Sequence, residues 1–250
     1  MSLSSRQPPK QAAQPPPGTY TVAEGFSLAQ KAATETTVAH LCSAADFLAR
    51  VFEVNNVPFA FMGGYSLWLR GSNRHTNDID LTVGCDMNHL INIIKSQQRI
   101  LRPQGPVSGT IRLFVRTGGV IENQGLPDLF TEADVMLSGT LGAPDDPQTA
   151  FEIVTREAPI GERSWPVLNI STLMSSKLGA FFGRGQGSPH SKDYIDIMFL
   201  ANKYREAVYA IRTQLNATHK QHVVNTYIQA SKGTGNEKKV KAIKYIFGCV

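Results

Sequence analysis

Apolar residues recur at near-helical spacing close to the N-terminus, over residues 27–54. The positions that carry this spacing are Leu28, Ala32, Val38, Leu41, Ala45, Leu48 and Phe52. Such a repeat predicts helical structure with an apolar face. After the turn NNVP, the apolar run Val57–Met62 is typical of a buried strand. Gly63 and Gly64 end this strand, and YSLWLRG then predicts a short helix that closes at Gly71.

Further along the chain the pattern changes between strand and helix. Strands are predicted over Asp78–Val83, Arg112–Arg116, Phe130–Leu137, FEIVT and WPVLNI. Helices are predicted over Asp86–Gln98, Ser171–Phe182, Lys192–Tyr204 and most of the remainder to Ile246. This order predicts an α/β (α+β) fold, in which a mixed β-sheet is flanked by helices and followed by a helical C-terminal portion. Five prolines among Ser and Gln predict a disordered tail over residues 1–22, which leaves a core over 23–170 and a helical region over 171–250.

The composition is that of a globular chain. It has 250 residues, of which 42% are apolar, enough to bury a substantial core. No apolar run reaches the roughly 18–20 residues that span a bilayer, and Pro, Gln and Ser stand where a signal peptide would be apolar. We therefore expect a soluble, cytoplasmic protein with no membrane contact. The cysteines Cys42, Cys85 and Cys249 are far apart and predict free thiols.

Positive charge is concentrated in the last fifth of the chain. From residue 201 onward there are nine Lys or Arg against two Glu, a net charge of +7, which leaves −2 for the remainder of a chain whose total is +5. A basic helical module attracts polyanions such as RNA, but basic helices without exposed aromatic residues are also common as plain solvated surfaces. Both interpretations stay open.

Two aspartates share one face of the strand Asp78–Val83. Side chains alternate along a strand, so Asp78 and Asp80 point one way while Ile79 and Leu81 point into the core. Adjacent carboxylates repel each other unless a cation lies between them, and carboxylate oxygens suit Mg²⁺ or Mn²⁺. The alternative is a solvent-facing strand with two ordinary surface aspartates.

The segment before this strand has features of a phosphate site. Gly63 and Gly64 end a buried strand and open a helix, with Ser66 close behind. Glycine permits close approach of backbone to phosphate, and free N–H groups at a helix start favour anions. Arg74 and Thr76 then precede the aspartates. We predict that these residues bind nucleotide phosphates, although a tight turn without a ligand would have the same glycines.

The segment GGYSLWLRGSNRHTNDIDLTV resembles the signature of the nucleotidyltransferase superfamily. The resemblance implies a nucleotidyltransferase-type fold, with the catalytic core over residues 23–170. It also implies a third metal-binding carboxylate on a later strand, where TEADVML supplies Asp134. The expected metal ligands are therefore Asp78, Asp80 and Asp134.

A second segment, LNISTLMSSKLGAFFGRGQGSPHSKDYIDIMFL, resembles the C-terminal motif of AbiEii-type toxin nucleotidyltransferases. Lys177 and Arg184 are two helical turns apart and are expected to face the same way toward a triphosphate. Asp193 is expected to hold Lys177 in place or to act near the nucleotide, whereas Asp196 is expected to face elsewhere. The likeness covers roughly residues 57–200 and does not include the N-terminal tail or the basic C-terminal helices.

The resemblance implies an enzyme that moves a nucleoside monophosphate from an NTP to a hydroxyl acceptor and releases pyrophosphate. A tRNA or other RNA end is the acceptor implied by the toxin-like branch, and a small hydroxylated molecule is the enzymatic alternative. The competing interpretation is a non-catalytic nucleotide- or RNA-binding module of the same fold. Zinc binding by His40, His75, His89 and His190 matches no known ligand spacing. The sequence gives no indication of the oligomeric state.

Overall fold

The computed structural model describes residues 16–121, 125–185, 187–233 and 235–249. The strands are β1 (Thr19–Tyr20), β2 (Phe59–Met62), β3 (Asp78–Val83), β4 (Ile100–Pro103), β5 (Thr110–Thr117), β6 (Leu129–Leu137), β7 (Phe151–Ala158) and β8 (Gly161–Leu168). The α-helices are α1 (Val22–Glu35), α2 (Val38–Val54), α3 (Gly63–Leu69), α4 (Met87–Lys95), α5 (Ile170–Gly183), α6 (Lys192–Lys203), α7 (Arg205–Ile211), α8 (Ala217–Ala230) and α9 (Glu237–Phe247), and a 3-10 turn spans Gly119–Ile121.

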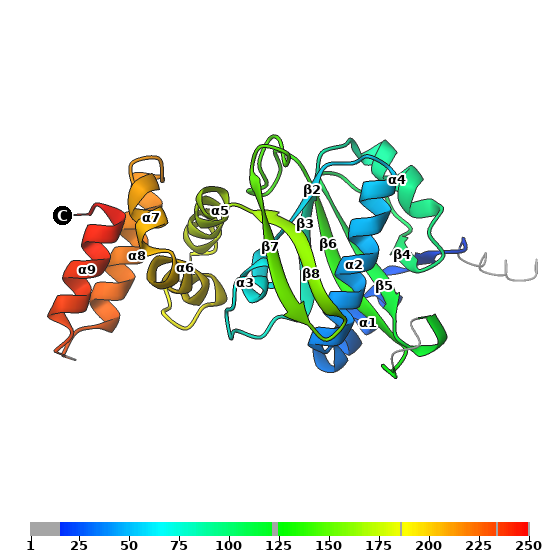
Figure 1. Cartoon of the computed structure of the whole chain (residues 1–250), viewed down its shortest axis with the longest axis horizontal. Helices are drawn as coiled ribbons and strands as arrows, with labels where there is room; N and C mark the ends of the chain where they lie inside the picture. Colours follow the sequence, from blue (N-terminus) through cyan, green and yellow to red (C-terminus); the bar gives the residue numbers. More distant parts are fainter. Residues whose placement is uncertain (1–15, 122–124, 186, 234, 250) are drawn as a thin grey trace, which may run out of the picture.

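Within the described residues the strands form one eight-stranded sheet in the order β1-β4-β5-β6-β3-β2-β8-β7. Three neighbouring pairs are parallel (β1 with β4, β3 with β6, β2 with β8) and the other four are antiparallel. The sheet is therefore mixed, and the predicted α/β (α+β) fold class is confirmed. The helix α2 crosses one face of this sheet, while α5 to α9 gather at its β7 and β8 side (Figure 1).

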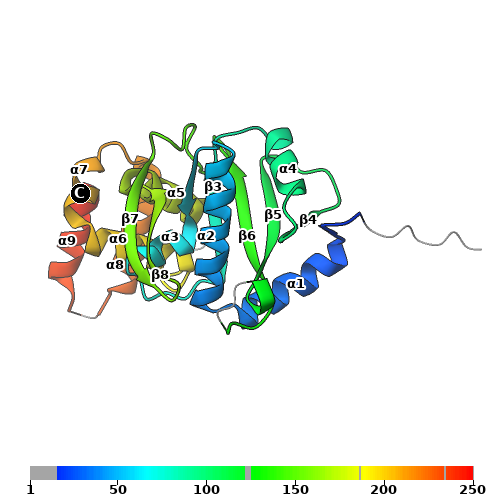
Figure 2. The ribbon, with the colours of Figure 1, turned by 45° about the vertical axis from the view of Figure 1, so that its right-hand side comes forward.

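The helical pattern predicted over residues 27–54 is helical in the structure, but the chain forms two helices that meet at Thr36 and Thr37. Thr37 begins α2 with a capping box, in which its hydroxyl accepts from the His40 N–H and the His40 ring contacts the Thr37 N–H. Such a cap satisfies backbone groups that a continuous helix would pair internally. The apolar repeat continues across the break, so spacing alone did not show it. A view turned by 45° shows the two helices running in different directions (Figure 2).

Two strands near the sheet edge were not predicted, namely β1 and β4. Tyr20 is buried and its ring meets Phe114 edge-on, with centroids 5.1 Å apart. β1 pairs with β4 through its backbone while the Tyr20 ring packs on β5, so the end of the predicted tail over 1–22 forms part of the sheet. The first 15 residues of that tail lie outside the described residues.

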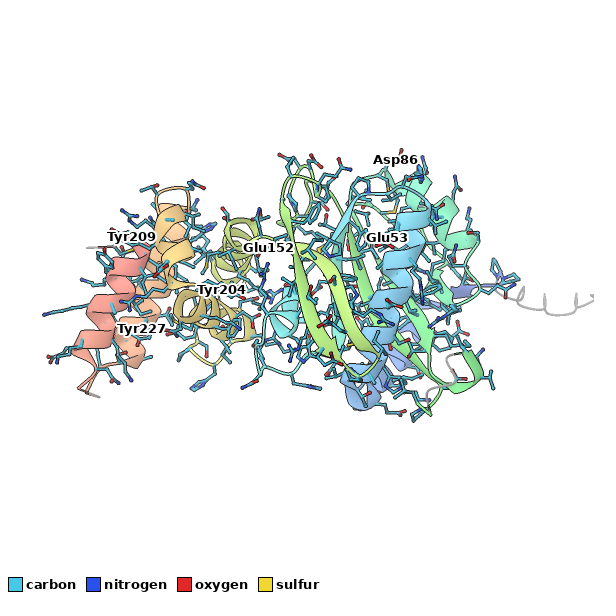
Figure 3. The ribbon with its side chains drawn as sticks, viewed as in Figure 1. Glu53, Asp86, Glu152, Tyr204, Tyr209 and Tyr227 are labelled. Atoms are coloured by element: carbon cyan, nitrogen blue, oxygen red, sulfur yellow. The ribbon has the colours of Figure 1, made fainter. Side chains whose placement is uncertain are left out.

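Strand β2 separates two hydrophobic clusters. Phe59 and Phe61 belong to the cluster formed with α2 and α4, whereas Ala60 and Met62 belong to the cluster formed with α5 to α9. Side chains alternate across a strand, so β2 contributes one face to each cluster. Figure 3 shows Tyr204, Tyr209 and Tyr227 among the C-terminal helices and Glu152 on the strand nearest to them.

Over the described ranges, no helix is both long and apolar enough to cross a bilayer. All three cysteines are free thiols, and Cys42 is buried. Burial raises the pKa of the Cys42 thiol to about 11, a change that the hydrogen bond from Tyr65 partly opposes. The Cys42 thiol therefore stays protonated, and a protonated thiol is a poor nucleophile. Cys42 serves as a packing residue of the core.

Candidate active site

Parallel pairing of β3 with β6 places acidic residues in two adjacent rows. Asp80 lies opposite Asp134, and Asp78 lies opposite Glu132. Residues directly opposite each other on neighbouring strands share a face of the sheet, so all four carboxylates are on one face. Alternation along β3 keeps Ile79 and the other apolar residues in the core. Strand pairing thus brings all four carboxylates together, whereas alternation along the sequence predicted a shared face only for the two aspartates of β3.

The two glycines make room for side chains of the site. Gly63 has a φ of +60°, and a Cβ atom there would lie 1.7 Å from Oδ2 of Asp80. A Cβ atom at Gly64 would lie 2.5 Å from Oγ1 of Thr76 and 2.7 Å from Nη2 of Arg74. The Gly64 N–H donates to Asp80. The glycines therefore permit Asp80, Arg74 and Thr76 to pack against the strand-to-helix turn.

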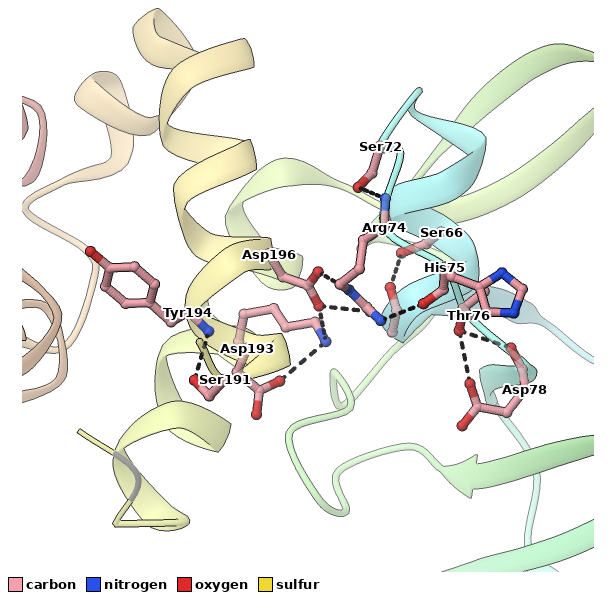
Figure 4. Close-up of polar contacts among 12 residues, drawn as sticks. Ser66, Ser72, Arg74, His75, Thr76, Asp78, Ser191, Asp193, Tyr194 and Asp196 are labelled. Atoms are coloured by element: carbon pink, nitrogen blue, oxygen red, sulfur yellow. Dashed lines mark hydrogen bonds and ion pairs between the residues drawn. The ribbon is translucent and has the colours of Figure 1, made fainter. Parts of the chain in front are cut away.

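The other residues predicted to bind phosphate already have partners within the protein (Figure 4). Arg74 donates from Nε and Nη2 to Asp196 at 2.6 and 3.0 Å. Thr76 donates to Oδ1 of Asp78 at 2.9 Å, and the buried Ser66 hydroxyl donates to the Gly63 carbonyl at 3.0 Å. These contacts orient the turn and Asp78. Phosphate binding by Ser66, Arg74 and Thr76 stays a prediction.

Helices α5 and α6 contribute a second charged group. Lys177 Nζ lies 3.3 Å from Oδ1 of Asp193 and 2.8 Å from Oδ2 of Asp196. Nη1 of Arg184 donates to Oδ2 of Asp193 at 2.6 Å. Lys177 and Arg184 therefore both contact Asp193. This contact corresponds to one of the two roles expected for Asp193, and action near a nucleotide stays a prediction.

The prediction that Asp196 faces elsewhere is wrong. Its side chain is completely buried and accepts from both Lys177 and Arg74. Residues three apart on a helix lie on the same face, so Asp193 and Asp196 point together from α6. Asp196 links the turn after α3 to α5.

One cavity of about 800 Å³ brings most of the predicted residues together. Those that line it are Gly63, Asp80, Asp134, Lys177, Arg184 and Asp193. Among the described residues, the predicted positions that do not line it are Asp78, Gly64, Ser66, Arg74 and Thr76. Asp80 and Asp134 line the sheet side together with Arg112, whereas Lys177 and Arg184, on and directly after α5, line the helical side together with Asp193. We call the sheet side, with the neighbouring Asp78 and Glu132, the acidic wall and the helical side the basic wall. Its volume is within the roughly 300–1,000 Å³ that is usual for small-molecule sites.

Lys177 and Arg184 retain donors for a ligand. An ammonium group has three N–H donors, and Lys177 uses two on Asp193 and Asp196. Arg184 has five donors and is more than half exposed. Both side chains can therefore bind an anion in the cavity while their own ion pairs remain.

The acidic wall is electrostatically strained. Burial raises the pKa of Asp80 to about 7, and the charges of Asp78 and Asp134 add to the rise, while Lys177 and the Gly64 N–H oppose it. Burial likewise raises the pKa of Glu132, although Arg112 opposes this. A cation among these oxygens would relieve the repulsion. The donor chemistry therefore fits a hard divalent cation, with Asp80 between Asp78 and Asp134.

The carboxylates do not converge on a single point. Among the residues that the structure describes, no three His, Cys, Asp or Glu side chains are arranged to hold one metal ion. Asp134 instead accepts from Arg112 Nε at 3.1 Å and from its Nη2 at 3.3 Å. Asp134 must therefore turn if it is to share a cation with Asp80.

Arg112 and Glu132 were not among the site residues predicted from the sequence. Glu132 lies two residues before Asp134, and alternation along the strand could have placed both on one face. Arg112 lies opposite Asp134 on β5, a pairing that depends on the sheet register. Its proximity to the carboxylates could not be predicted from local pattern.

Comparison with known protein families gives a match over most of the chain. The family described as "Nucleotidyl transferase AbiEii toxin, Type IV TA system" matches residues 46–243. No curated protein sequence matches the chain.

Solved structures with a similar fold include an antigenic nucleotidyltransferase-like protein from Paracoccidioides brasiliensis. The two are 15% identical with a TM-score of 0.50, over 81% of this chain and 93% of that one. The JHP933 protein from Helicobacter pylori is 15% identical with a TM-score of 0.44, over 85% of this chain and 91% of that one. The first likeness shows a shared fold. Since the family match spans most of the chain, including both charged walls of the cavity, the protein belongs to the AbiEii toxin family of nucleotidyltransferases.

Proposed function

We propose that the protein transfers a nucleoside monophosphate from an NTP to a hydroxyl acceptor, with a divalent cation bound by Asp78, Asp80 and Asp134. The observation that carries this proposal is the cavity with Asp80 and Asp134 on one wall and Lys177 and Arg184 on the other. An NTP complexed with Mg²⁺ has the complementary distribution, because its metal needs oxygen ligands and its phosphates need cations.

The roles of the residues follow from this placement. The acceptor oxygen attacks the α-phosphorus and loses its proton to Asp134, while the bond from the α-phosphorus to the bridging oxygen breaks. Pyrophosphate leaves with the electron pair of that bond, and Lys177 and Arg184 neutralise its charge. Asp193 holds the side chains of Lys177 and Arg184 in position. A bound Mg²⁺ or Mn²⁺ supplies further charge stabilisation at the phosphate oxygens.

The test is pyrophosphate release from each NTP in the presence of Mg²⁺. Wild type should release pyrophosphate when a suitable acceptor is supplied, and the Asp78→Ala/Asp80→Ala double variant should not. Equal release from both proteins would exclude this site as the catalytic centre. Mass spectrometry of acceptor mixtures would identify the product that carries the added nucleotide.

A non-catalytic binding module is the alternative from a different class. Calorimetry separates the two, because the enzyme should bind NTP more tightly with Mg²⁺ than without it. A binding module would bind NTP with little dependence on the metal and would never turn it over.

For the acceptor, we favour an RNA over a small molecule because of the basic C-terminal helices. Lys232, Lys238, Lys239 and Lys241 are exposed. In both views α9 lies at the end of the helical portion away from the sheet (Figures 1 and 2). An acceptor that contacts α9 and also enters the cavity must be extended, as a polynucleotide is.

Binding of tRNA at several salt concentrations tests this acceptor. Affinity should fall steeply with salt, and each lysine of α9 changed to Gln should reduce the slope of log affinity against log salt by about one. Affinity that does not depend on salt, or no binding at low salt, would favour a small hydroxylated acceptor.

A further inference from the structure

Arg112 contacts two carboxylates of the acidic wall at once. Its Nε and Nη2 donate to the two oxygens of Asp134 at 3.1 and 3.3 Å. The same Nε lies 2.9 Å from Oε1 of Glu132. Glu132 and Asp134 are two residues apart on β6, on the same face of the sheet. One guanidinium therefore lies between a predicted metal ligand and an acidic neighbour to which no role is assigned.

The sheet register explains why this position matters. Arg112 on β5 and Asp80 on β3 lie on opposite sides of Asp134. Asp134 thus lies between the cation of Arg112 and the carboxylate with which it is expected to share a metal. A guanidinium on Asp134 repels a second cation there, and the repulsion between like charges is strong in a partly buried site.

We propose that Arg112 is a positioning residue that exchanges between Asp134 and Glu132, so that Glu132 retains the guanidinium when Asp134 turns to bind a divalent cation. This inference rests on the metal site of the proposed function. The exchange requires little movement, because Nε is already within hydrogen-bonding distance of Glu132. The Arg112 side chain is 49% exposed, so it has room to rotate without backbone change.

The exchange predicts opposite effects on metal affinity from two neutral substitutions. Arg112→Gln removes the competing charge from Asp134, so the divalent cation should bind about tenfold more tightly, equivalent to about 1.4 kcal/mol. Glu132→Gln leaves the guanidinium with Asp134 as its carboxylate partner, so affinity should fall about tenfold, again about 1.4 kcal/mol. Because Glu132 acts through Arg112, the double variant should bind the cation as tightly as Arg112→Gln alone.

The chain offers a matched control pair near the end of β5, where Arg116 contacts Asp128, the residue directly before β6. Arg116, on the same strand as Arg112, donates to both oxygens of Asp128 at 2.9 and 2.6 Å. Neither residue lines the cavity. Arg116→Gln and Asp128→Asn change the net charge as the test variants do, and both should leave metal affinity within about twofold of wild type.

The experiment is a titration of the full-length chain with Mn²⁺ in the absence of NTP. Free Mn²⁺ is measured by electron paramagnetic resonance, and each variant is first checked for a cooperative thermal transition. Should Arg112→Gln fail to fold, Arg112→Met replaces it, since methionine is also unbranched and carries no charge. The Arg112→Met variant should bind Mn²⁺ more tightly than wild type, and Glu132→Gln should weaken binding less in that background than in wild type.

The outcomes separate this inference from the function on which it rests. Unchanged or weaker Mn²⁺ binding by a folded Arg112 variant would overturn the exchange, as would a double variant as weak as Glu132→Gln, because Glu132 would then be a direct ligand. Absence of Mn²⁺ binding by wild type would overturn both the metal site and the exchange. Normal Mn²⁺ binding without NTP turnover would overturn the proposed function and leave the exchange measurable.

Discussion

Gly63 leaves space for the Asp80 carboxylate, and this close approach limits which residues can replace the glycine. Its positive φ and the 1.7 Å separation between a built Cβ and Oδ2 of Asp80 both disfavour alanine. Gly63→Ala should therefore lower the melting temperature and abolish pyrophosphate release, because Asp80 must move. Gly233 has a φ of +74° with no atom within 4 Å of a built Cβ. Gly233→Ala should lower the free energy of unfolding only by the cost of a positive φ, about 1–2 kcal/mol, and the variant should keep its activity. Equal effects of the two substitutions would exclude the steric explanation.

Asp80 itself should make stability depend on pH. Its pKa of about 7 in the folded chain lies above the unfolded value of about 3.9. Between those values the folded chain binds a proton that the unfolded chain has lost, so the free energy of unfolding falls as pH rises through this window. Asp80→Asn removes this loss and should raise the free energy of unfolding at pH 8 by about 1–2 kcal/mol. Urea denaturation at pH 5 and pH 8 measures the effect, and an equal gain at both pH values would contradict it.

At the scale of elements, α5, α6 and the turn after α3 are joined through Asp196. This carboxylate is fully buried and accepts from Arg74 and Lys177. Asp196→Asn removes the charge that pairs with the Arg74 and Lys177 side chains. Because breaking a buried ion pair costs about 3–5 kcal/mol, the free energy of unfolding should fall by about that amount. Asp128→Asn breaks an exposed bidentate pair with Arg116 and should cause little change. Chemical denaturation of both variants gives the comparison, and similar losses would mean that burial does not strengthen the Asp196 pairs.

The same elements show what the sequence could predict. The bounds of β3 were predicted correctly, because strict alternation and a core face leave one register for Asp78–Val83. The break between α1 and α2 was missed because a threonine cap interrupts the backbone without interrupting the apolar repeat. The position of Asp196 was missed although its spacing from Asp193 on a helix indicated a shared face. Arg112 required the pairing of β5 with β6, which is a tertiary property.

At the scale of the whole molecule, the sheet and the C-terminal helices depend on each other. Both walls of the cavity are needed for the proposed site, and α5 supplies the basic one. Lys203 of α6 also donates to the Arg70 carbonyl at the end of α3, and Arg70 pairs with Glu152 of β7 at 2.6 Å. These polar contacts bind the helical region to the sheet on the side where α5 follows β8. One hydrophobic cluster also includes residues from both sides of the predicted boundary at residue 170.

This packing predicts that a chain ending at residue 170 does not fold on its own. The apolar side chains that it would expose come from several strands and from α3, and they are Ala60, Met62, Leu67, Met136 and Leu168. Burial of apolar area is the main stabilising term, and these residues form one face of the sheet and its turn. The fragment should lack a cooperative thermal transition by circular dichroism, and addition of a separate fragment over 171–250 should restore one. A cooperative transition for the first fragment alone would show that the sheet and α2 supply sufficient stability, and the helical region would then be an appended domain.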